Sequence, residues 1–529
     1  MFQLQIPDHL CVFTESAQFS FAGTAEMQKE DIVVKLKPEN SGIGIRVSAD
    51  TTPVTFVRLR WEHKFPAETL FLGDAWERAY GDLQWRTFDS HRFMPWYFLA
   101  HFSGVTAGCG VRVCPGAMAV WNIDPAGITL SLDLRNGTRG VILKGREIAV
   151  AVVVSAEYPK GTPFDAAKSF CKLMCSDPLP LRTPVYGGNN WYYAYGDSSH
   201  GEILADSRYI ASLSEGLANR PFMVIDDGWE IMHQKPGNSG PWTCGNEKYP
   251  DMQKLADEMR SCGVRPGIWM RPLWNIDPAI PEMWKLPERN HTNLRALDPS
   301  RPEVIALVEE DIRRLSGWGY ELIKHDFSTN DIFGRWGWEA TPWLAAEENW
   351  HFADRSRTSA EIVVDFYKAI LGASNGALIL GCNTIGHLGA GLMHIARIGD
   401  DTSGNAWGKT RKMGVNSLAF RLCQHKAFFE VDADCVGITG KIPWQKNRQW
   451  TELLACSSTP FFASIRPGSL TAQEFAEMKQ LFAVASRQDV AAEPVNWLAD
   501  TLPEIWRFDG KEKRFHWYSD ESACLSWDV

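Results

Sequence analysis

Between about residues 181 and 487, short apolar stretches alternate with longer amphipathic ones, and this alternation constrains the fold more than any other feature. Stretches such as 222–225 and 265–270 have the length and composition of buried strands. Stretches such as 252–262 and 301–318 have the spacing of helices that pack along one face. A chain that repeats strand and helix builds a parallel sheet, because each helix returns the chain to the start of the next strand.

Eight such strands can be counted, which is the number in a closed (β/α)8 TIM barrel. They are predicted to end near Trp191, Asp226, Trp269, Asp326, Cys382, Arg397, Asp432 and Ser464. A doubly wound open sheet is the alternative, but no GxGxxG motif follows the first predicted strand. We therefore expect a (β/α)8 barrel.

The two flanks of the barrel have β character. Before residue 180, many short segments rich in Val and Ile, such as 32–36 and 43–47, are separated by turn-forming residues. After residue 488, apolar and polar residues alternate. The prediction is a multidomain chain with an N-terminal antiparallel β-sandwich (1–180), a central (β/α)8 TIM barrel (181–487) and a small C-terminal β-unit (488–529).

Bulk properties exclude some partners. The formal net charge of −10 argues against a nucleic-acid partner held by phosphate contacts. No stretch approaches the roughly 20 apolar residues of a membrane span. Residues 1–9 lack the basic and apolar regions of a signal peptide, which predicts a cytoplasmic location. The twelve cysteines have no paired spacing, so we expect reduced thiols and no structural zinc site.

The fourth predicted strand is followed by two opposite charges. Lys324 and Asp326 are two residues apart, so they face the same way in an extended chain. Burying either charge alone is costly, and pairing them reduces that cost. The pairing also keeps the carboxylate ionised, as a nucleophile must be. A purely structural salt bridge at a strand end is the alternative.

Polar and aromatic side chains collect at the carboxyl ends of the predicted strands, where TIM barrels place active sites. They are Trp191, Tyr192, Asp226, Asp227, Trp269, Arg271, Lys324, Asp326, Cys382, Asn383, Arg397, Asp400, Asp401, Asp432 and Asp434. Carboxylates accept hydrogen bonds from sugar hydroxyls, and indole rings stack on sugar faces. A metal site is the alternative, but no His lies at ligand spacing, and Lys324 and Arg397 compete for the carboxylates. Neutral-sugar recognition fits better.

At these strand ends the sequence resembles the α-galactosidase clan of retaining glycosidases, most closely glycoside hydrolase family 36. Six short motifs in family order carry the resemblance. They are Val-Ile-Asp-Asp-Gly-Trp at 224–229, Pro-Gly-Ile-Trp at 266–269, Lys-His-Asp-Phe at 324–327, Gly-Cys at 381–382, Arg-Ile-Gly-Asp-Asp-Thr at 397–402 and Asp-Ala-Asp-Cys at 432–435. The match is strongest over the barrel and extends to both flanks.

The resemblance implies a role for each matching residue. Asp326 would be the nucleophile, and Asp401 would be the acid/base. Asp226 and Asp227 would bind sugar hydroxyls, which are O4 and O6 in a galactosidase. Lys324, Cys382 and Arg397 would line the same pocket. Trp191 and Trp269 would be its aromatic walls, and Trp76, from the sandwich, would close it. The resemblance implies a glycoside or oligosaccharide substrate and no cofactor or metal, and it allows a homo-oligomer.

Two positions leave alternatives open. Asp400 competes with Asp401 for the acid/base role, although the spacing from Arg397 and the following Thr402 favour Asp401. Arg271 follows Trp269 where the family usually has a small residue or a carboxylate. It could bind an anionic group on the sugar or serve as a structural ion-pair partner.

The predicted function is a retaining exo-α-glycosidase that acts on terminal α-D-galactosyl or closely related residues. In such an enzyme the two carboxyls lie roughly 5–5.5 Å apart, against about 6.5–9.5 Å in an inverting one. Three alternatives remain: another glycone such as α-N-acetylgalactosamine, β-L-arabinopyranose or a charged galactose; a transglycosylase with the same catalytic pair; and a non-catalytic sugar-binding protein.

Overall fold

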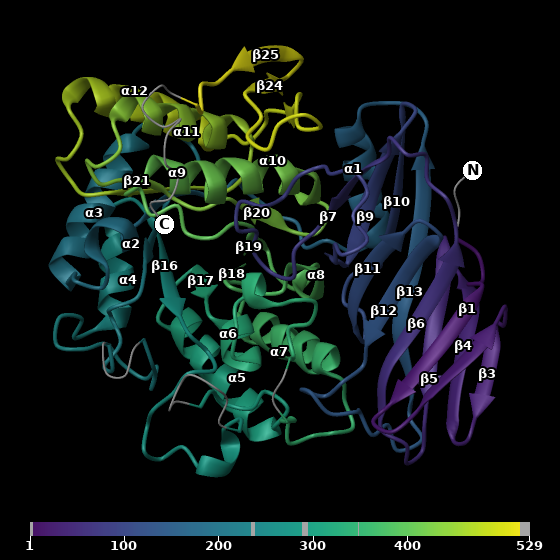
Figure 1. Cartoon of the computed structure of the whole chain (residues 1–529). Helices are drawn as coiled ribbons and strands as arrows, with labels where there is room; N and C mark the ends of the chain where they lie inside the picture. Colours follow the sequence, from purple (N-terminus) through teal and green to yellow (C-terminus); the bar gives the residue numbers. More distant parts are fainter. Residues whose placement is uncertain (1–3, 234–237, 288–294, 347–348, 519–529) are drawn as a thin grey trace.

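A computed structural model describes residues 4–233, 238–287, 295–346 and 349–518. The chain has an antiparallel β-sandwich, a parallel barrel and a small C-terminal sheet, so the predicted fold class is confirmed. Figure 1 shows the sandwich packed against one side of the barrel, with the C-terminal strands lying over helices at the end of the chain. No helix among these described residues is both long and apolar enough to cross a membrane.

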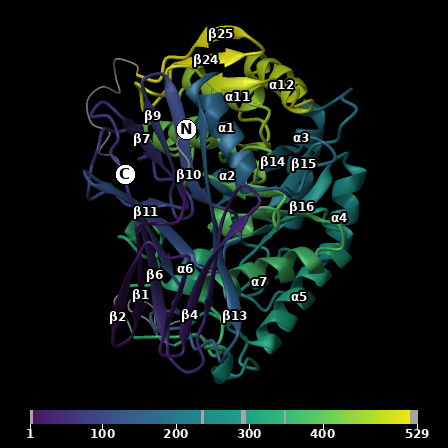
Figure 2. The same ribbon diagram turned by 90° about the vertical axis from the view of Figure 1, so that its right-hand side faces the viewer.

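The sandwich consists of two antiparallel sheets that face each other (Figure 2). The six-stranded sheet has the order β2 (Gln18–Ala22), β1 (His9–Thr14), β6 (Val54–Glu62), β12 (Gly127–Asp133), β11 (Met118–Asp124) and β8 (Met94–Pro95). The seven-stranded sheet has the order β3 (Glu26–Lys29), β4 (Ile32–Glu39), β5 (Gly42–Ser48), β13 (Glu147–Tyr158), β10 (Val105–Val111), β9 (Tyr97–Phe102) and β7 (Leu70–Gly73).

Alternating side chains fill the space between these sheets. Along β6, Val57, Leu59 and Trp61 are buried, and the residues between them are more exposed. The indole of Trp61 stacks on that of Trp121 from β11, with ring centroids 6.1 Å apart. The period-2 pattern in the sequence therefore forms a packed interior.

The barrel sheet has nine parallel segments, which form the eight strands of a closed barrel. Its order is β20 (Glu430–Asp432), β19 (Ile395–Arg397), β18 (Leu378–Gly381), β17 (Leu322–His325), β16 (Arg265–Met270), β15 (Phe222–Ile225), β14 (Tyr186–Asn189), β22 (Phe461–Ile465) and β21 (Val436–Ile438). The first and last of these are separated only by residues 433–435. They are two pieces of the seventh strand, and the ring closes through that segment.

Helices surround the barrel between these strands. The longer ones are α3 (His200–Leu213), α4 (Met252–Ser261), α5 (Pro302–Gly317), α7 (Ser359–Ala373), α11 (Trp444–Cys456) and α12 (Ala472–Ala485). The short ones are α2 (Trp191–Ala194), α6 (Ser328–Phe333), α8 (Gly386–Gly389), α9 (Trp407–Lys409) and α10 (Ser417–Arg421). Thr358 and Thr471 begin α7 and α12 with capping boxes, in which Glu361 and Glu474 bind back to the cap. These signals explain why both helix starts can be predicted from the sequence.

Helix α1 (Pro163–Met174) leads out of the sandwich, and a three-stranded antiparallel sheet ends the described chain. The sheet consists of β23 (Ala492–Pro494), β24 (Ile505–Phe508) and β25 (Lys511–Arg514). Lys513 forms an ion pair with Glu452 of α11, and the backbone N–H of His516 donates to Gln449 at 2.7 Å. The predicted C-terminal β-unit thus packs on the barrel.

A loop of the sandwich, residues 74–80, is joined to the end of β19. The backbone N–H of Ala79 donates to Ile398 O at 2.8 Å, and the N–H of Asp400 donates to Ala79 O at 3.0 Å. Arg421 of α10 lies beneath this junction, and its Nε donates to Asp74 Oδ1 at 2.7 Å. The sandwich therefore determines where the chain runs immediately after the sixth strand.

Replacing Arg421 tests this junction. Arg421→Met leaves the Asp74 carboxylate, whose side chain is only 6% exposed, without its cation. Loss of one partner of such a buried pair is expected to lower the free energy of unfolding by about 3 kcal/mol. Arg313→Met is the control, because Arg313 is 52% exposed and pairs with Glu309 along one helix. Denaturant unfolding that shows equal losses in both variants would contradict the structural role of the junction.

Candidate active site

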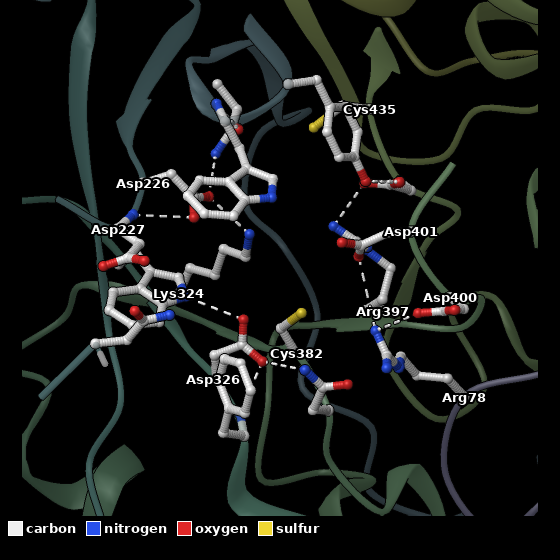
Figure 3. Close-up of a pocket in the computed structure, with 18 of the residues that line it drawn as sticks. Arg78, Asp226, Asp227, Lys324, Asp326, Cys382, Arg397, Asp400, Asp401 and Cys435 are labelled. Carbon is white, nitrogen blue, oxygen red and sulfur yellow. Dashed lines mark hydrogen bonds and ion pairs between the residues drawn. The ribbon is translucent and has the colours of Figure 1, made fainter. Parts of the chain in front are cut away.

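A cavity of about 310 Å³ lies at the carboxyl ends of the barrel strands (Figure 3). Its walls include every residue that was given a role from the sequence except Arg271 and Trp76, and Asp432, noted at the end of the seventh strand, is also not among them. Those present are Trp191, Asp226, Asp227, Trp269, Lys324, Asp326, Cys382, Arg397, Asp400 and Asp401. Side chains at the carboxyl ends of barrel strands point toward the barrel axis and out of that end of the barrel. Residues far apart in the sequence therefore meet here.

Asp326 stands just past the end of β17 and is only 7% exposed. Its Oδ2 accepts from Trp269 Nε1 at 3.0 Å, and its Oδ1 accepts from the Phe327 N–H at 2.7 Å and from the amide of Asn383. Burial alone would raise its pKa, but the charge of Lys324 and the Trp269 hydrogen bond outweigh burial and lower the pKa below its usual range. Asp326 is therefore an ionised carboxylate.

Lys324 has a different partner from the one the sequence predicts. Its Nζ binds Asp226 Oδ2 at 2.7 Å rather than Asp326. Both residues were expected to face one way from an extended strand, but β17 ends at His325 and the chain turns at Phe327, whose φ is 63°. The ammonium thus links strands 2 and 4, and acts on Asp326 as a nearby charge.

Asp226 and Asp227 follow β15 and point to different partners. Oδ2 of Asp226 also accepts from Asn189 Nδ2 at 2.7 Å, and its N–H donates to Asn190 at 2.8 Å. Asp227 instead lies 3.2 Å from His233 Nδ1. Burial raises the pKa of Asp227 to about 7, although its contact with His233 opposes this. Both carboxyl groups keep oxygen lone pairs that can accept from a ligand in the cavity.

Arg397 is the second buried cation of the site. It lies 3.1 Å from Asp401, 3.3 Å from Asp432 and 2.6 Å from Asp434. Burial alone would lower its pKa, but the surrounding carboxylates raise it well above its usual range. The guanidinium therefore stays charged and holds strands 6 and 7 together beside Asp401.

Asp400 and Asp401 both reach the cavity but have different surroundings. Arg78 Nη1, from the sandwich loop, lies 3.0 Å from Asp400 Oδ1 and 3.7 Å from Asp401 Oδ1. The side chain of Asp401 is 39% exposed and that of Asp400 is 25% exposed. Asp400 is thus the closer partner of Arg78, and Asp401 is the more accessible carboxyl.

Trp76 does not close the cavity as predicted, because its ring is turned into the core. It packs edge-on against Trp96 with centroids 5.0 Å apart, and its Nε1 donates to Pro342 O at 2.9 Å. Arg78 and Tyr80 of the same loop line the cavity instead. The sequence drew attention to this loop, but pattern alone could not show which of its side chains turns inward.

Arg271 is a structural ion-pair partner, which was one of its two predicted roles. Its guanidinium binds Asp331 of α6 at 2.5 Å and lies between the rings of Trp274 and Phe327, 4.2 Å from each centroid. Phe327 lines the cavity next to Asp326. Arg271 therefore packs against Phe327 and supports the turn that follows Asp326, without itself lining the cavity.

Several residues that line the cavity were not predicted to belong to the site. Trp336 and Trp338 come from the segment after α6, where no strand-end motif marks them. Tyr192, Asn383 and Asp434 were noted at strand ends but given no role. The remaining walls are Asn189, Asn238 and Cys435. Loops that wall a barrel site have no periodic signal, and only the fold brings them together.

One group of side chains could hold a metal ion. The ligand atoms of Asp227, Glu230 and His233 lie within 4.8 Å of one another. The sequence offered no His at ligand spacing among the strand-end aspartates, but the turn after β15 brings His233 back to Asp227. His233 Nδ1 already contacts Asp227 at 3.2 Å and Glu230 at 3.4 Å, and these contacts raise the pKa of His233 to about 9. We assign no metal to this group.

Comparison with known proteins bears on the fold. No family model matches the chain. Its structure is similar to that of the α-galactosidase TtGalA from Thermus thermophilus, with a TM-score of 0.60 and 17% identity over 96% of this chain and 98% of that one. For the family 36 α-galactosidase AgaA from Geobacillus stearothermophilus, solved with stachyose, the TM-score is 0.59 and the identity 15% over 90% and 71% of the two chains. The galactosidase domain of AgaSK, an α-galactosidase–sucrose kinase, gives a TM-score of 0.60 at 16% identity over 90% and 70%.

These likenesses define the class of fold. The chain has the three-part architecture of family 36 α-galactosidases, so the resemblance read from six short motifs is confirmed at the level of the fold. At these identities the comparison shows architecture, and the chemistry is argued below from the residues of this chain.

The contacts of His233 with Asp227 and Glu230 predict that the stability contributed by His233 depends on pH. The pKa of His233 is raised from its ordinary 6.5 to about 9 by Asp227 and Glu230. Its stabilising contribution is therefore complete below about pH 6.5 and is lost as the pH rises through about 9. We expect His233→Gln to lower the thermal midpoint at pH 6 and to differ much less from wild type at pH 10. An equal difference at both pH values would contradict the ion pair.

Proposed function

We propose that the protein is a retaining exo-α-glycosidase that hydrolyses terminal α-D-galactosyl or closely related residues. One observation carries the proposal: Asp326, a buried carboxylate with a lowered pKa, opens onto the same cavity as Asp401, a more exposed carboxyl. Two carboxyls in such different surroundings can divide the roles of nucleophile and acid/base.

In the first step, Asp326 attacks the anomeric carbon while Asp401 donates its proton to the leaving oxygen. The bond from C1 to that oxygen breaks, and a covalent glycosyl–Asp326 ester forms. The hydrogen bonds from Trp269, Asn383 and the Phe327 N–H hold the attacking carboxylate in one orientation.

In the second step, Asp401 takes a proton from water, and the resulting hydroxide displaces Asp326 from C1. The proton taken by Asp401 replaces the one that it gave to the leaving group, so the enzyme is restored. Two inversions at C1 give net retention of configuration.

The sugar would be held at the opposite end of the cavity from Asp401. Asp226 and Asp227 accept from ring hydroxyls, and the half-buried indole of Trp191 offers an apolar face. Lys324 remains a donor there, because an ammonium has three N–H bonds and, within the described part of the chain, its side chain donates to Asp226 alone. The cavity of about 310 Å³ is at the small end of ligand sites, which suits removal of one terminal residue.

Asp401 is the better candidate for the acid/base. Each of the two carboxyls contacts a guanidinium, Asp400 that of Arg78 at 3.0 Å and Asp401 that of Arg397 at 3.1 Å, so exposure distinguishes them. A general acid must carry a proton and must reach the leaving oxygen. Asp401 has the greater exposure, and the Asp400 N–H is bonded to the sandwich loop.

Three alanine variants separate these roles. With an unactivated glycoside, Asp401→Ala should lower kcat/KM by about 10²–10⁴-fold, and Asp326→Ala by at least as much. Added azide should accept the glycosyl group as the inverted azide in Asp326→Ala and as the retained azide in Asp401→Ala. Asp400→Ala is the matched control, expected to lose less than tenfold and to form no glycosyl azide.

A panel of aryl glycosides identifies the glycone, and NMR of the first product identifies the stereochemistry. An α-anomer released from an α-galactoside supports retention. Release of the β-anomer, or unchanged turnover in Asp326→Ala and Asp401→Ala, would contradict the proposed mechanism. A larger loss in Asp400→Ala than in Asp401→Ala would exchange the roles of these neighbours.

A further inference from the structure

A second cavity, of about 290 Å³, adjoins the active-site cavity, and we call it the outer cavity. It lies between the sandwich segment 73–95 and the barrel segment 337–342. Arg78, Tyr80 and Trp338 line both cavities. A ligand that extends past these three side chains would therefore occupy both.

The outer cavity adjoins the acid/base side of the active site. Arg78, which separates the cavities, lies 3.0 Å from Asp400 and 3.7 Å from Asp401. Figure 3 shows Asp226 and Asp227 on the other side, beyond Asp326. Because the acid/base protonates the leaving oxygen, the leaving group of the substrate would point toward Arg78 and the outer cavity.

Two arginines of this cavity have no carboxylate partner among the residues that the structure describes. Arg92 donates to the backbone oxygens of Phe71 at 2.8 Å and Gln84 at 3.2 Å. Arg86 donates from Nε at 2.6 Å and from Nη2 at 2.7 Å to the side-chain oxygen of Gln84, with the Gln84 amide oriented so that its oxygen faces the guanidinium. Burial, and after it the neighbouring charge of Arg86, lowers the pKa of Arg92 to about 10, although the charges of Asp82 and Asp89 partly oppose this.

The carboxylates of the same cavity offset the charge of these two arginines only in part. Asp74 is already bound to Arg421 at 2.7 Å and to Gln424 at 2.9 Å. Asp82 is exposed and accepts from the Tyr80 N–H at 3.4 Å. An electropositive cavity on a chain with a net charge of −10 is unusual, and paired guanidiniums are suited to carboxylate, sulfate or phosphate.

We propose that the outer cavity binds the leaving-group part of the substrate and that Arg86 and Arg92 select a leaving group that carries an anionic substituent. Trp338, which is 62% exposed, and Phe93, which is 46% exposed, offer aromatic surfaces to its sugar ring. The proposal rests on the proposed function. It specifies an acidic oligosaccharide, or a glycoside of a phosphorylated, sulfated or carboxylated unit, as the substrate class.

The test compares substrates with neutral and anionic leaving groups. Melibiose carries a neutral glucose ring, and melibionate carries the open-chain gluconate made by oxidising it. Melibiitol, which carries the neutral open-chain glucitol, controls for the loss of the ring and should be hydrolysed no faster than melibiose. At low salt, wild type should show a kcat/KM for melibionate about tenfold or more above that for melibiose. Raising the ionic strength should reduce this ratio.

Variants place the preference in the outer cavity. Arg86→Gln, at an exposed position, and Arg92→Gln should bring the ratio close to one, with unchanged turnover of p-nitrophenyl α-galactoside. Arg487→Gln removes an equal charge at a 56% exposed position elsewhere and should leave the ratio unchanged. A ratio of one in wild type, or a ratio that neither cavity variant alters, would overturn the proposal.

A binding measurement separates this proposal from the proposed function. Calorimetry should show that gluconate binds wild type more tightly than glucose does, and that Arg86→Gln abolishes the difference. This result would support the outer cavity even if no aryl glycoside were hydrolysed, which would instead contradict the proposed function. Equal binding of gluconate and glucose would overturn the inference whatever the glycosidase assay shows.

Discussion

The structure depends on two cations buried among carboxylates at one end of a barrel. Lys324 binds Asp226, and Arg397 binds Asp401 and Asp434. Burying any one of these charges without its partners would be strongly unfavourable, so the ends of strands 2, 4, 6 and 7 have to meet in one arrangement. The same charge balance lowers the pKa of Asp326 and leaves it ionised inside the protein. Fold and proposed chemistry thus share one physical cause.

The sandwich is part of the site rather than an attachment to it. Its loop pairs with the backbone at Gly399, immediately before the two candidate acids, and sends Arg78 to Asp400. Arg421 anchors that loop from below through Asp74. Movement of the sandwich relative to the barrel would therefore displace Asp400 and its neighbour, and the chain would lose both the active-site wall and the outer cavity.

Periodicity and local motifs predicted what lies on regular elements. Seven of the eight strand ends, and ten of the twelve residues given a role from the sequence, line one cavity, because the position of a residue on a barrel strand determines where it points. The errors concern tertiary choices. Lys324 pairs across the barrel and Trp76 turns into the core, while α11, which has no side-chain cap, was not predicted. Arg78 reaches the site from a loop, and spacing says nothing about such approaches.

The most direct test of the central claim is to trap the glycosyl–enzyme intermediate. A fluorinated α-galactosyl fluoride slows the second step more than the first, so the ester accumulates and can be located by mass spectrometry of proteolytic peptides. The account predicts time-dependent inactivation with one sugar attached to Asp326. A sugar attached to Asp400, Asp401 or any other residue, or steady hydrolysis of natural glycosides through an enzyme that never carries a sugar, would contradict it.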